Sequence, residues 1–274
     1  MLREIYFLAI CLMAAPIASE SAAEVKIAIL DSGCNIEYEE GISFVDDTTI
    51  DLNGHGTAIA KIIKRINPNA KLYVAKVFNQ NGRNLDATPF VRGIHWAISH
   101  QVDLINFSWQ IHKDQKAIHN AIQEAYHQGI IMVAAAGNRD ALLDVLVAER
   151  NSHSQKRGIS TGVKYPAKYR EVIAIGATKS LWWLDRHERY SPTGAEIEFV
   201  CDGSYSTQKG TSFAAARAAA IVSKIKTDHP DLGGARLRAM LRLYARDLGD
   251  KGKDAKFGYG KLEYRSSEMV RIMS

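Results

Sequence analysis

Short apolar runs alternate with helical patterns along most of the chain. Continuous apolar runs of this length predict strands buried in the middle of a parallel sheet. These runs cover residues 25–30, 71–78, 102–108, 130–136 and 172–177. Between the first two runs, Ile59, Ile62, Ile63 and Ile66 recur at the spacing of one helical face.

Turn and cap residues predict further helices. Thr88 is predicted as an N-cap before Pro89 in the first turn of a helix that continues through His100. A second helix carries apolar residues from Ile118 to Ala125 and is predicted to end at Gly129. The string "KGTSFAAARAAAIVSKI", residues 209–225, predicts a glycine-led turn followed by a long alanine-rich helix.

This alternation of strand and helix predicts an α/β fold with three layers, in which a mostly parallel sheet lies between helices. No internal repeat, low-complexity tract or linker divides residues 24–274, which are therefore predicted to form one domain. In such sheets the active site forms at the carboxyl ends of the strands.

The first 23 residues differ from the rest of the chain. The stretch from Ile5 to Ala18 has no charged residue and is too short for a bilayer-spanning helix, which needs about 20 residues. Small residues, Ser21 to Ala23, follow it, and this pattern is typical of a secretory signal peptide. We predict cleavage after Ala23, a secreted or periplasmic protein and no stable membrane anchor; a buried N-terminal helix is the alternative.

The amino-acid composition narrows the classes of molecule that this protein is predicted to bind. The chain has 274 residues, of which 46% are hydrophobic and 24% charged, as in ordinary globular proteins. The net charge of +5 is mild, and no basic run is interleaved with aromatic residues, so no nucleic-acid partner is predicted. The nine histidines form neither an H-E-x-x-H motif nor a Cys/His cluster, so no metal site is predicted.

Three cysteines are present, and Cys11 lies in the predicted signal peptide. Cys34 and Cys201 remain in the mature chain. An oxidising compartment would permit a disulfide between them, and two buried free thiols are equally compatible with the sequence.

Four polar residues stand where strands end or helices begin. Asp31 follows the first strand, His55 lies between two glycines before a helix, Asn138 follows the strand at 130–136, and Ser212 begins the alanine-rich helix. Each residue alone is typical of a turn or a helix cap. Together they supply the acid, base, amide donor and nucleophile that acyl transfer requires.

The chemistry explains why these four residue types belong together. A serine hydroxyl is a weak nucleophile until an imidazole removes its proton. The imidazole needs a carboxylate that fixes its tautomer and stabilises the imidazolium. The oxyanion of the tetrahedral intermediate needs preorganised N–H donors, which the Asn138 side chain and the Ser212 backbone can provide.

The motifs "LDSG", "GHGTAIA", "AAAGN" and "GTSFAAA", in this order, resemble those of the subtilisin-like serine peptidases, or subtilases. Weaker similarities in "LINFSW", "YPAKYREVIAIGAT" and "FGYGKLE" extend the resemblance over about residues 25–265. The resemblance implies a sheet of about seven strands, protein or peptide substrates, and a triad of Asp31, His55 and Ser212 with Asn138 in the oxyanion hole. It also implies substrate-binding roles for a further set of residues: Ser108, Trp109, Gln110 and Gly137.

Several positions depart from the family pattern. Gln110 stands where the family usually has a glycine that leaves the specificity pocket open, which predicts a narrowed or polar pocket. Ala216 replaces a usual proline and Arg217 a frequent histidine, with no catalytic penalty expected. Family members often bind structural calcium, but those ligands have no match here, so a calcium requirement stays open.

Three further features concern the start of the domain and two of its internal segments. Asp31 comes eight residues after the predicted cleavage site, so no propeptide is apparent, and we expect unassisted folding or a separately encoded folding assistant or inhibitor. Residues 139–164 include Arg150, Lys156 and Arg157 and are expected to form a solvated loop, with an exosite or self-cleavage site as the alternative. Trp182 and Trp183 are expected to pack, or to meet a partner.

The sequence therefore predicts a secreted serine endopeptidase that works through an acyl-enzyme. Two other functions remain as alternatives. An esterase-type hydrolase is disfavoured because Ser212 lacks the G-x-S-x-G motif. A secreted binding protein on a subtilase scaffold is disfavoured because all four chemical groups are retained.

Overall fold

The computed structural model describes residues 24–81, 86–139, 162–181 and 184–265. Three predictions lie outside the described residues: the signal peptide at 1–23, the roles of Arg150, Lys156 and Arg157, and the packing of Trp182 and Trp183. Among the described residues, no helix combines the length and apolar character that crossing a bilayer requires.

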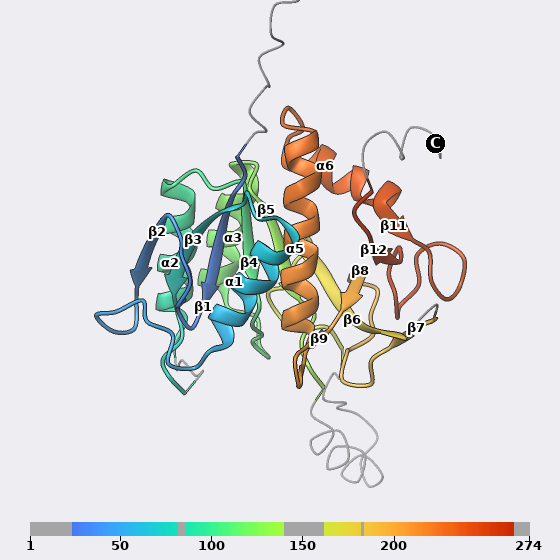
Figure 1. Ribbon diagram of the computed structural model, residues 1–274, viewed down its shortest axis with the longest axis horizontal. Helices are drawn as coiled ribbons and strands as arrows, with labels where there is room; N and C mark the ends of the chain where they lie inside the picture. Colours follow the sequence, from blue (N-terminus) through green and yellow to red (C-terminus); the bar gives the residue numbers. More distant parts are fainter. Residues whose placement is uncertain (1–23, 82–85, 140–161, 182–183, 266–274) are drawn as a thin grey trace, which may run out of the picture.

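A parallel sheet forms the centre of the molecule (Figure 1). Its seven neighbouring parallel strands occur in the order β2 (Glu40–Ser43), β3 (Lys71–Lys76), β1 (Lys26–Asp31), β4 (Leu104–Phe107), β5 (Ile131–Ala135), β6 (Ile173–Leu181) and β8 (Ile197–Asp202). The prediction of a mostly parallel α/β sheet is confirmed, and the five apolar runs correspond to β1, β3, β4, β5 and β6.

Shorter strands complete the sheet at one side. The parallel strand β12 (Lys261–Leu262) pairs with β8, and two antiparallel strands, β11 (Ala245–Arg246) and β7 (Leu184–His187), pair with β12 and β6. A separate antiparallel pair consists of β9 (Ser204–Tyr205) and β10 (Gln208–Lys209). The similarity of "FGYGKLE" to a closing strand corresponds to β12.

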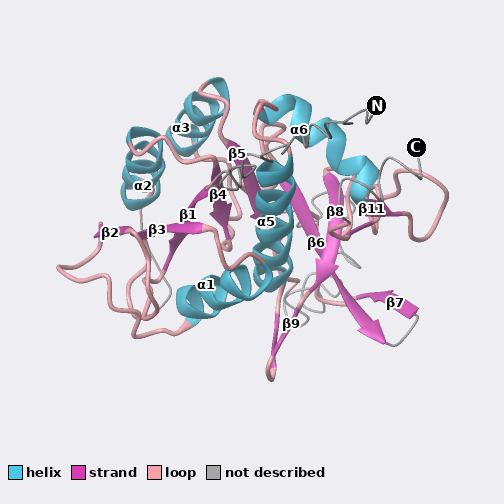
Figure 2. Cartoon of the chain, turned by 45° about the horizontal axis from the view of Figure 1, so that its top comes forward, coloured by secondary structure: helices cyan, strands magenta, loops and turns pink. Residues whose placement is uncertain are grey.

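Helices cover both faces of the sheet (Figure 2). One face packs against α1 (His55–Ile66) and α5 (Thr211–Asp228), and the other against α2 (Thr88–Ser99) and α3 (Lys116–His127). Side chains alternate across a strand, so Ile27 and Ile29 belong to the first core and Ala28 and Leu30 to the second. A short helix, α6 (Gly234–Met240), and a 3₁₀ helix (Leu241–Tyr244) follow α5.

The alanine-rich composition of α5 fits its central position. Ala214, Ala215, Ala218 and Ala219 are fully buried, because α5 packs against both α1 and the sheet. Small side chains allow this close approach of helix to sheet. Ala216, which stands where the family usually has proline, is also fully buried. The helix is regular at this position, as predicted.

One predicted helix start is wrong by a residue. Thr88 is the first residue of α2 rather than its N-cap, which is Ala87. The reason is that Asp86 accepts a hydrogen bond at 2.5 Å from the Thr88 backbone N–H. An aspartate two residues earlier therefore satisfies a backbone donor at the start of the helix.

Candidate active site

A cleft of about 280 Å³ lies at the carboxyl edge of the sheet, where α1 and α5 begin. Its lining comes from six parts of the chain that are distant in sequence. The lining residues are Asp31, Ser32, Asn53, His55, Phe78, Ser108, Trp109, Gln110, Ala135, Gly137, Asn138, Thr211 and Ser212. All eight site residues predicted from the sequence are in this set.

Asp31 and His55 are in direct contact. The Nδ1 atom of His55 lies 2.7 Å from Oδ1 of Asp31, at the junction of β1 and α1. The Asp31 side chain is 2% exposed and that of His55 31% exposed. Burial alone would lower the pKa of His55, but the charge and hydrogen bond of Asp31, with the charge of Asp51, raise it above its ordinary value.

Steric constraints explain why glycine occupies the positions on both sides of His55. Gly54 precedes α1 with φ of +84°, a conformation that favours glycine. A Cβ at Gly56 would lie 2.2 Å from the Gly33 carbonyl oxygen, so only glycine allows α1 to approach the chain after β1 this closely. The helix therefore begins near enough to Asp31 for His55 to reach it.

Asp51 organises the same junction and was missed by the sequence analysis. It is 4% exposed, and its carboxylate accepts hydrogen bonds from the Ser32 hydroxyl, the backbone N–H groups of Asn53 and Gly54, and both the backbone and hydroxyl of Thr57. Burial would raise the pKa of Asp51, but these bonds lower it below its ordinary value. The only indication of this role in the sequence is the position of Asp51, four residues before His55.

Ser32 links Asp51 to the catalytic pair. Its hydroxyl lies 2.9 Å from Asp51 Oδ1 and 3.2 Å from Asp31 Oδ1, and it accepts the Gly56 backbone N–H. Its own backbone N–H donates to Asp31 Oδ1 at 2.8 Å. The Asp31 Oδ1 atom is therefore held by the Ser32 backbone N–H and by His55 Nδ1.

A buried lysine positions the segment that precedes Asp51. Lys76, at the end of β3, is 1% exposed, and its Nζ donates to Asp46 Oδ2 at 2.6 Å and to the Ile50 carbonyl at 2.9 Å. Asp46 is 40% exposed. Because Ile50 directly precedes Asp51, this internal cation connects β3 to the network around His55.

Ser212 lies in the first turn of α5, and its hydroxyl donates to the Ser108 carbonyl at 2.8 Å. The Ser108 hydroxyl in turn donates to the Ser212 carbonyl at 3.0 Å and accepts from Asn106 Nδ2 at 2.8 Å. The start of α5 is thus joined to the end of β4. Ser212 is not a helix cap, because Gly210 occupies that position and has no side chain.

Within the described residues, the Ser212 hydroxyl bonds to Ser108 and not to the imidazole of His55. Both side chains line the same cleft. A change of the serine χ1 rotamer redirects its hydroxyl at small cost, and catalytic hydrogen bonds are often unformed without substrate. The arrangement is therefore compatible with proton transfer from Ser212 to His55.

Thr211 fixes the side-chain amide of Asn138 and was also missed by the sequence analysis. The Asn138 Oδ1 accepts both the backbone N–H and the hydroxyl of Thr211, each at 3.0 Å. The Thr211 hydroxyl also accepts the Gly137 backbone N–H at 3.2 Å. With its oxygen engaged twice, Asn138 presents its NH₂ group as the donor end.

The residues assigned to substrate binding form one end of the cleft. Trp109 is 6% exposed and packs against Phe90, with ring centroids 4.3 Å apart, so its position is set by the core. The Gln110 Oε1 accepts the Asn138 backbone N–H at 2.6 Å. Gln110 therefore spans the space between the ends of β4 and β5.

Neither cysteine lines the cleft. Cys34 and Cys201 are buried free thiols, so the disulfide alternative is not what the structure contains. Burial raises the pKa of Cys201 to about 12. Among the described residues, no group of three or more His, Cys, Asp and Glu could hold a metal ion, and a calcium requirement stays an open prediction.

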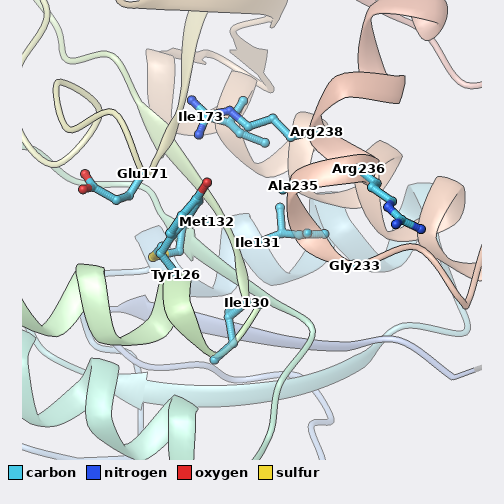
Figure 3. A pocket seen from close by; sticks show the side chains of 12 residues that line it. Tyr126, Ile130, Ile131, Met132, Glu171, Ile173, Gly233, Ala235, Arg236 and Arg238 are labelled. Carbon is cyan, nitrogen blue, oxygen red and sulfur yellow. The ribbon is translucent and has the colours of Figure 1, made fainter.

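A larger cavity, of about 380 Å³, lies at the opposite edge of the sheet. Figure 3 shows Ile131, Met132 and Ile173 between Glu171 on one side and Arg236 on the other. Glu171 bonds to His119 and Gln123, and the lining residues include no serine or cysteine. The chemistry therefore selects the smaller cleft as the candidate active site.

Comparisons with known proteins agree with this architecture. The model of the Subtilase family, Peptidase_S8, matches residues 22–260. Subtilisin DY of Bacillus licheniformis is 32% identical over 265 residues, which cover 87% of this chain and 88% of that protein. Minor extracellular protease Epr of Bacillus subtilis (strain 168) is 33% identical over 274 residues, which cover 91% of this chain. The match spans only 39% of the length of Epr.

A solved structure described as a lanthipeptide protease has the same fold. It superposes with a TM-score of 0.72 and covers 91% of this chain and 88% of its own. Its sequence identity of 22% supports the fold alone.

Proposed function

This chain belongs to the subtilase family of subtilisin-like serine peptidases, and on that premise we propose that it hydrolyses peptide bonds with Asp31, His55 and Ser212 as its catalytic triad. The observation that carries the proposal is the 2.7 Å contact between His55 and Asp31 in the cleft that Ser212 also lines. Protein or peptide substrates follow from the family.

In the proposed reaction, Ser212 Oγ leaves the Ser108 carbonyl and attacks the scissile carbonyl carbon. Because Nδ1 of His55 is engaged by Asp31, the proton on that nitrogen stays there and Nε2 is the free base that accepts the serine proton. His55 then returns this proton to the departing amine. Water attacks the resulting acyl-enzyme by the same route and releases the acid.

The oxyanion of each tetrahedral intermediate would be stabilised by the Asn138 NH₂ group and the Ser212 backbone N–H. Thr211 supports this role by orienting Asn138 through two hydrogen bonds. The Ser212 N–H belongs to the first turn of α5, where N–H groups lack partners within the helix and the dipole favours negative charge. Donors fixed before the reaction stabilise the transition state at little reorganisation cost.

We further propose that the protein is secreted or periplasmic, with residues 1–23 as its signal peptide. The apolar pattern of this segment supports the proposal. One relative is described as an extracellular protease. A separately encoded folding assistant or inhibitor remains a prediction, tested by whether refolding of residues 24–274 alone recovers active sites.

A single labelling experiment tests the catalytic assignment. The protein is incubated with a fluorophosphonate probe, the labelled residue is mapped, and casein cleavage is measured in parallel. We expect labelling at Ser212 together with cleavage, and loss of both in Ser212→Ala. Ser99→Ala, an exposed serine at the end of α2, is the matched control and should behave as wild type.

The same experiment separates the two alternatives. Labelling of Ser212 without cleavage of any protein or peptide would favour an esterase-type hydrolase. No labelling in a folded protein would favour a binding protein on the subtilase scaffold.

A further inference from the structure

The residue before the cut has to fit the acyl end of the cleft, and this inference rests on the proposed function. In the tetrahedral intermediate the reacting carbon is bonded to Ser212 Oγ, its oxyanion faces the Asn138 NH₂ group, and its nitrogen faces His55. The fourth bond leads to the Cα atom of the residue before the cut and points away from these three groups. Gln110 and Gly137, at the ends of β4 and β5, line the cleft on this remaining side.

The Gln110 side chain bridges the two walls of the cleft at this end. Its Oε1 accepts the Asn138 backbone N–H at 2.6 Å, although Gln110 follows β4 and Asn138 follows β5. A Cβ placed on Gly137 would lie 2.5 Å from the same Oε1, so the carboxamide lies directly against the Gly137 backbone. Because β4 and β5 are paired neighbours, the carboxamide occupies the space that opens where these two strands end.

A second side chain covers the same face of Gly137. The Cβ placed on Gly137 would lie 2.6 Å from Lys164 Cγ and 3.1 Å from Lys164 Cβ, which are aliphatic carbons. The Lys164 backbone N–H donates to the Ala136 carbonyl at 2.9 Å, which fixes the origin of this side chain. While Gln110 keeps its position, little space therefore remains beside Gly137 for a substrate side chain.

The residues around Gln110 are held in place by the core. Trp109 is 6% exposed, and its ring centroid lies 4.3 Å from that of Phe90. The Gly137 backbone N–H donates to the Thr211 hydroxyl at 3.2 Å. Because close-packed groups of this kind yield little, a large substrate side chain would have to displace the Gln110 side chain to enter.

We propose that this enzyme cleaves after small residues, glycine or alanine, and that Gln110 excludes larger ones. Glycine and alanine place at most a methyl group beside Gly137 and leave the bond from Asn138 to Gln110 intact. A larger side chain breaks this bond and covers the Asn138 N–H, and a covered donor without an acceptor is costly. The specificity thus comes from a clash with large side chains.

A peptide series that differs only at the residue before the cut tests the proposal. We expect kcat/KM for alanine and glycine to exceed that for leucine, phenylalanine and glutamate by about tenfold or more. Gln110→Ala removes the bridging carboxamide and should lower this ratio by about tenfold, through a gain of activity after leucine and phenylalanine. Gln128→Ala is the matched control and should keep the wild-type ratio, because Gln128 is exposed at the end of α3 and does not line the cleft.

Fluorophosphonate labelling of Ser212 in each variant reports folding and separates the possible failures. If wild type cuts best after any residue larger than alanine, the preference for small residues is wrong while the proposed function stands. If Gln110→Ala is labelled and keeps the wild-type ratio, Gln110 does not exclude large residues, and the proposal fails in the same way. If wild type cleaves no peptide of the series, the proposed function itself fails, and this inference fails with it.

Discussion

His55 Nδ1 lies 2.7 Å from Asp31 Oδ1, and this contact joins the last residue of β1 to the first residue of α1. The two residues are 24 positions apart in sequence. Their contact depends on Gly56, which allows α1 to approach the chain after β1, and on Asp51, which bonds to the backbone at the start of the helix.

The pH dependence of activity should reflect the raised pKa of His55. Since Asp31 and Asp51 together more than offset the effect of burial, kcat/KM should rise with pH through a pKa above 6.5, as neutral imidazole forms. Asp31→Asn should lower that apparent pKa and reduce kcat strongly. A pH–rate profile measures both, with His95→Gln as the control, because His95 is half exposed and pairs with Glu124 away from the cleft.

The raised pKa of His55 also affects the free energy of unfolding. This contribution decreases as pH rises, whereas the activity increases. A raised pKa means that the folded state binds the proton more tightly, so this contribution is fully present below the unfolded pKa of His55. It is lost as pH rises through the folded pKa. Urea unfolding of wild type and His55→Gln should therefore differ most in acid and converge in alkali. A constant difference across this range would contradict the assignment.

Thr211 should matter for kcat more than for KM. Thr211→Val keeps the shape of the side chain but removes the hydroxyl that bonds to Asn138 Oδ1 and Gly137 N–H. The Asn138 amide loses one of its two anchors, and we expect kcat to fall by about tenfold or more with KM little changed. Thr211→Ser should restore most of the activity, and equal effects of both substitutions on kcat would argue against the role.

Asp51 should stabilise the fold as well as the site. The two oxygens of the Asp51 carboxylate accept five hydrogen bonds. An asparagine side chain has only one acceptor oxygen, so it would leave some of these buried donors unpaired. We expect Asp51→Asn to lower the free energy of unfolding by about 2–4 kcal/mol. Urea unfolding measures this, and Asp47→Asn, at an exposed position four residues earlier, should stay within about 0.5 kcal/mol of wild type.

The pH dependence of that difference follows from the lowered pKa of Asp51. The contribution is present above the unfolded pKa, near 3.8, and is lost as pH falls through the lower folded value. The gap between wild type and Asp51→Asn should therefore be full at neutral pH and narrow in strong acid. A gap that widens in acid would contradict the network described here.

Lys76 should position the segment before Asp51. Lys76→Met removes a buried ammonium that bonds to Asp46 and to the Ile50 carbonyl. We expect a loss of about 1–3 kcal/mol in the free energy of unfolding, smaller than for a fully buried pair because Asp46 is 40% exposed, together with a lower kcat. Lys71→Met is the control, since Lys71 is 33% exposed and its pairs with Glu24 and Glu39 lie at the surface.

The position of the site could be predicted because its chemistry coincides with local signals. Asp31 and Asn138 follow apolar runs whose strand character is clear from the sequence, and His55 and Ser212 stand beside glycines at helix starts. The rule that parallel strands end at a common edge then brings the four residues to one region. Thr88 shows the limit of such signals, because Asp86 displaces the expected cap by one residue.

The residues that support the site could not be predicted in the same way. Asp51 and Lys76 are charged, and although Lys76 lies in an apolar run that predicts a buried strand, the neighbours of these residues in sequence do not show which groups compensate their charges. Lys76 is buried because Asp46 and the Ile50 carbonyl, 30 and 26 residues away, meet its ammonium. That compensation is visible only when the chain is folded.

The sequence by itself determined five buried strands, the helices α1, α2, α3 and α5, and the four polar residues that carry the chemistry, because each depends on short-range periodicity and sterics. Only the tertiary structure decided the pairings among distant side chains. Ser212 bonds to Ser108, 104 residues away, and Thr211 to Asn138, 73 residues away. Such bonds depend on which strands lie side by side and on the space between their ends, and a one-dimensional pattern of polar and apolar residues does not contain that information.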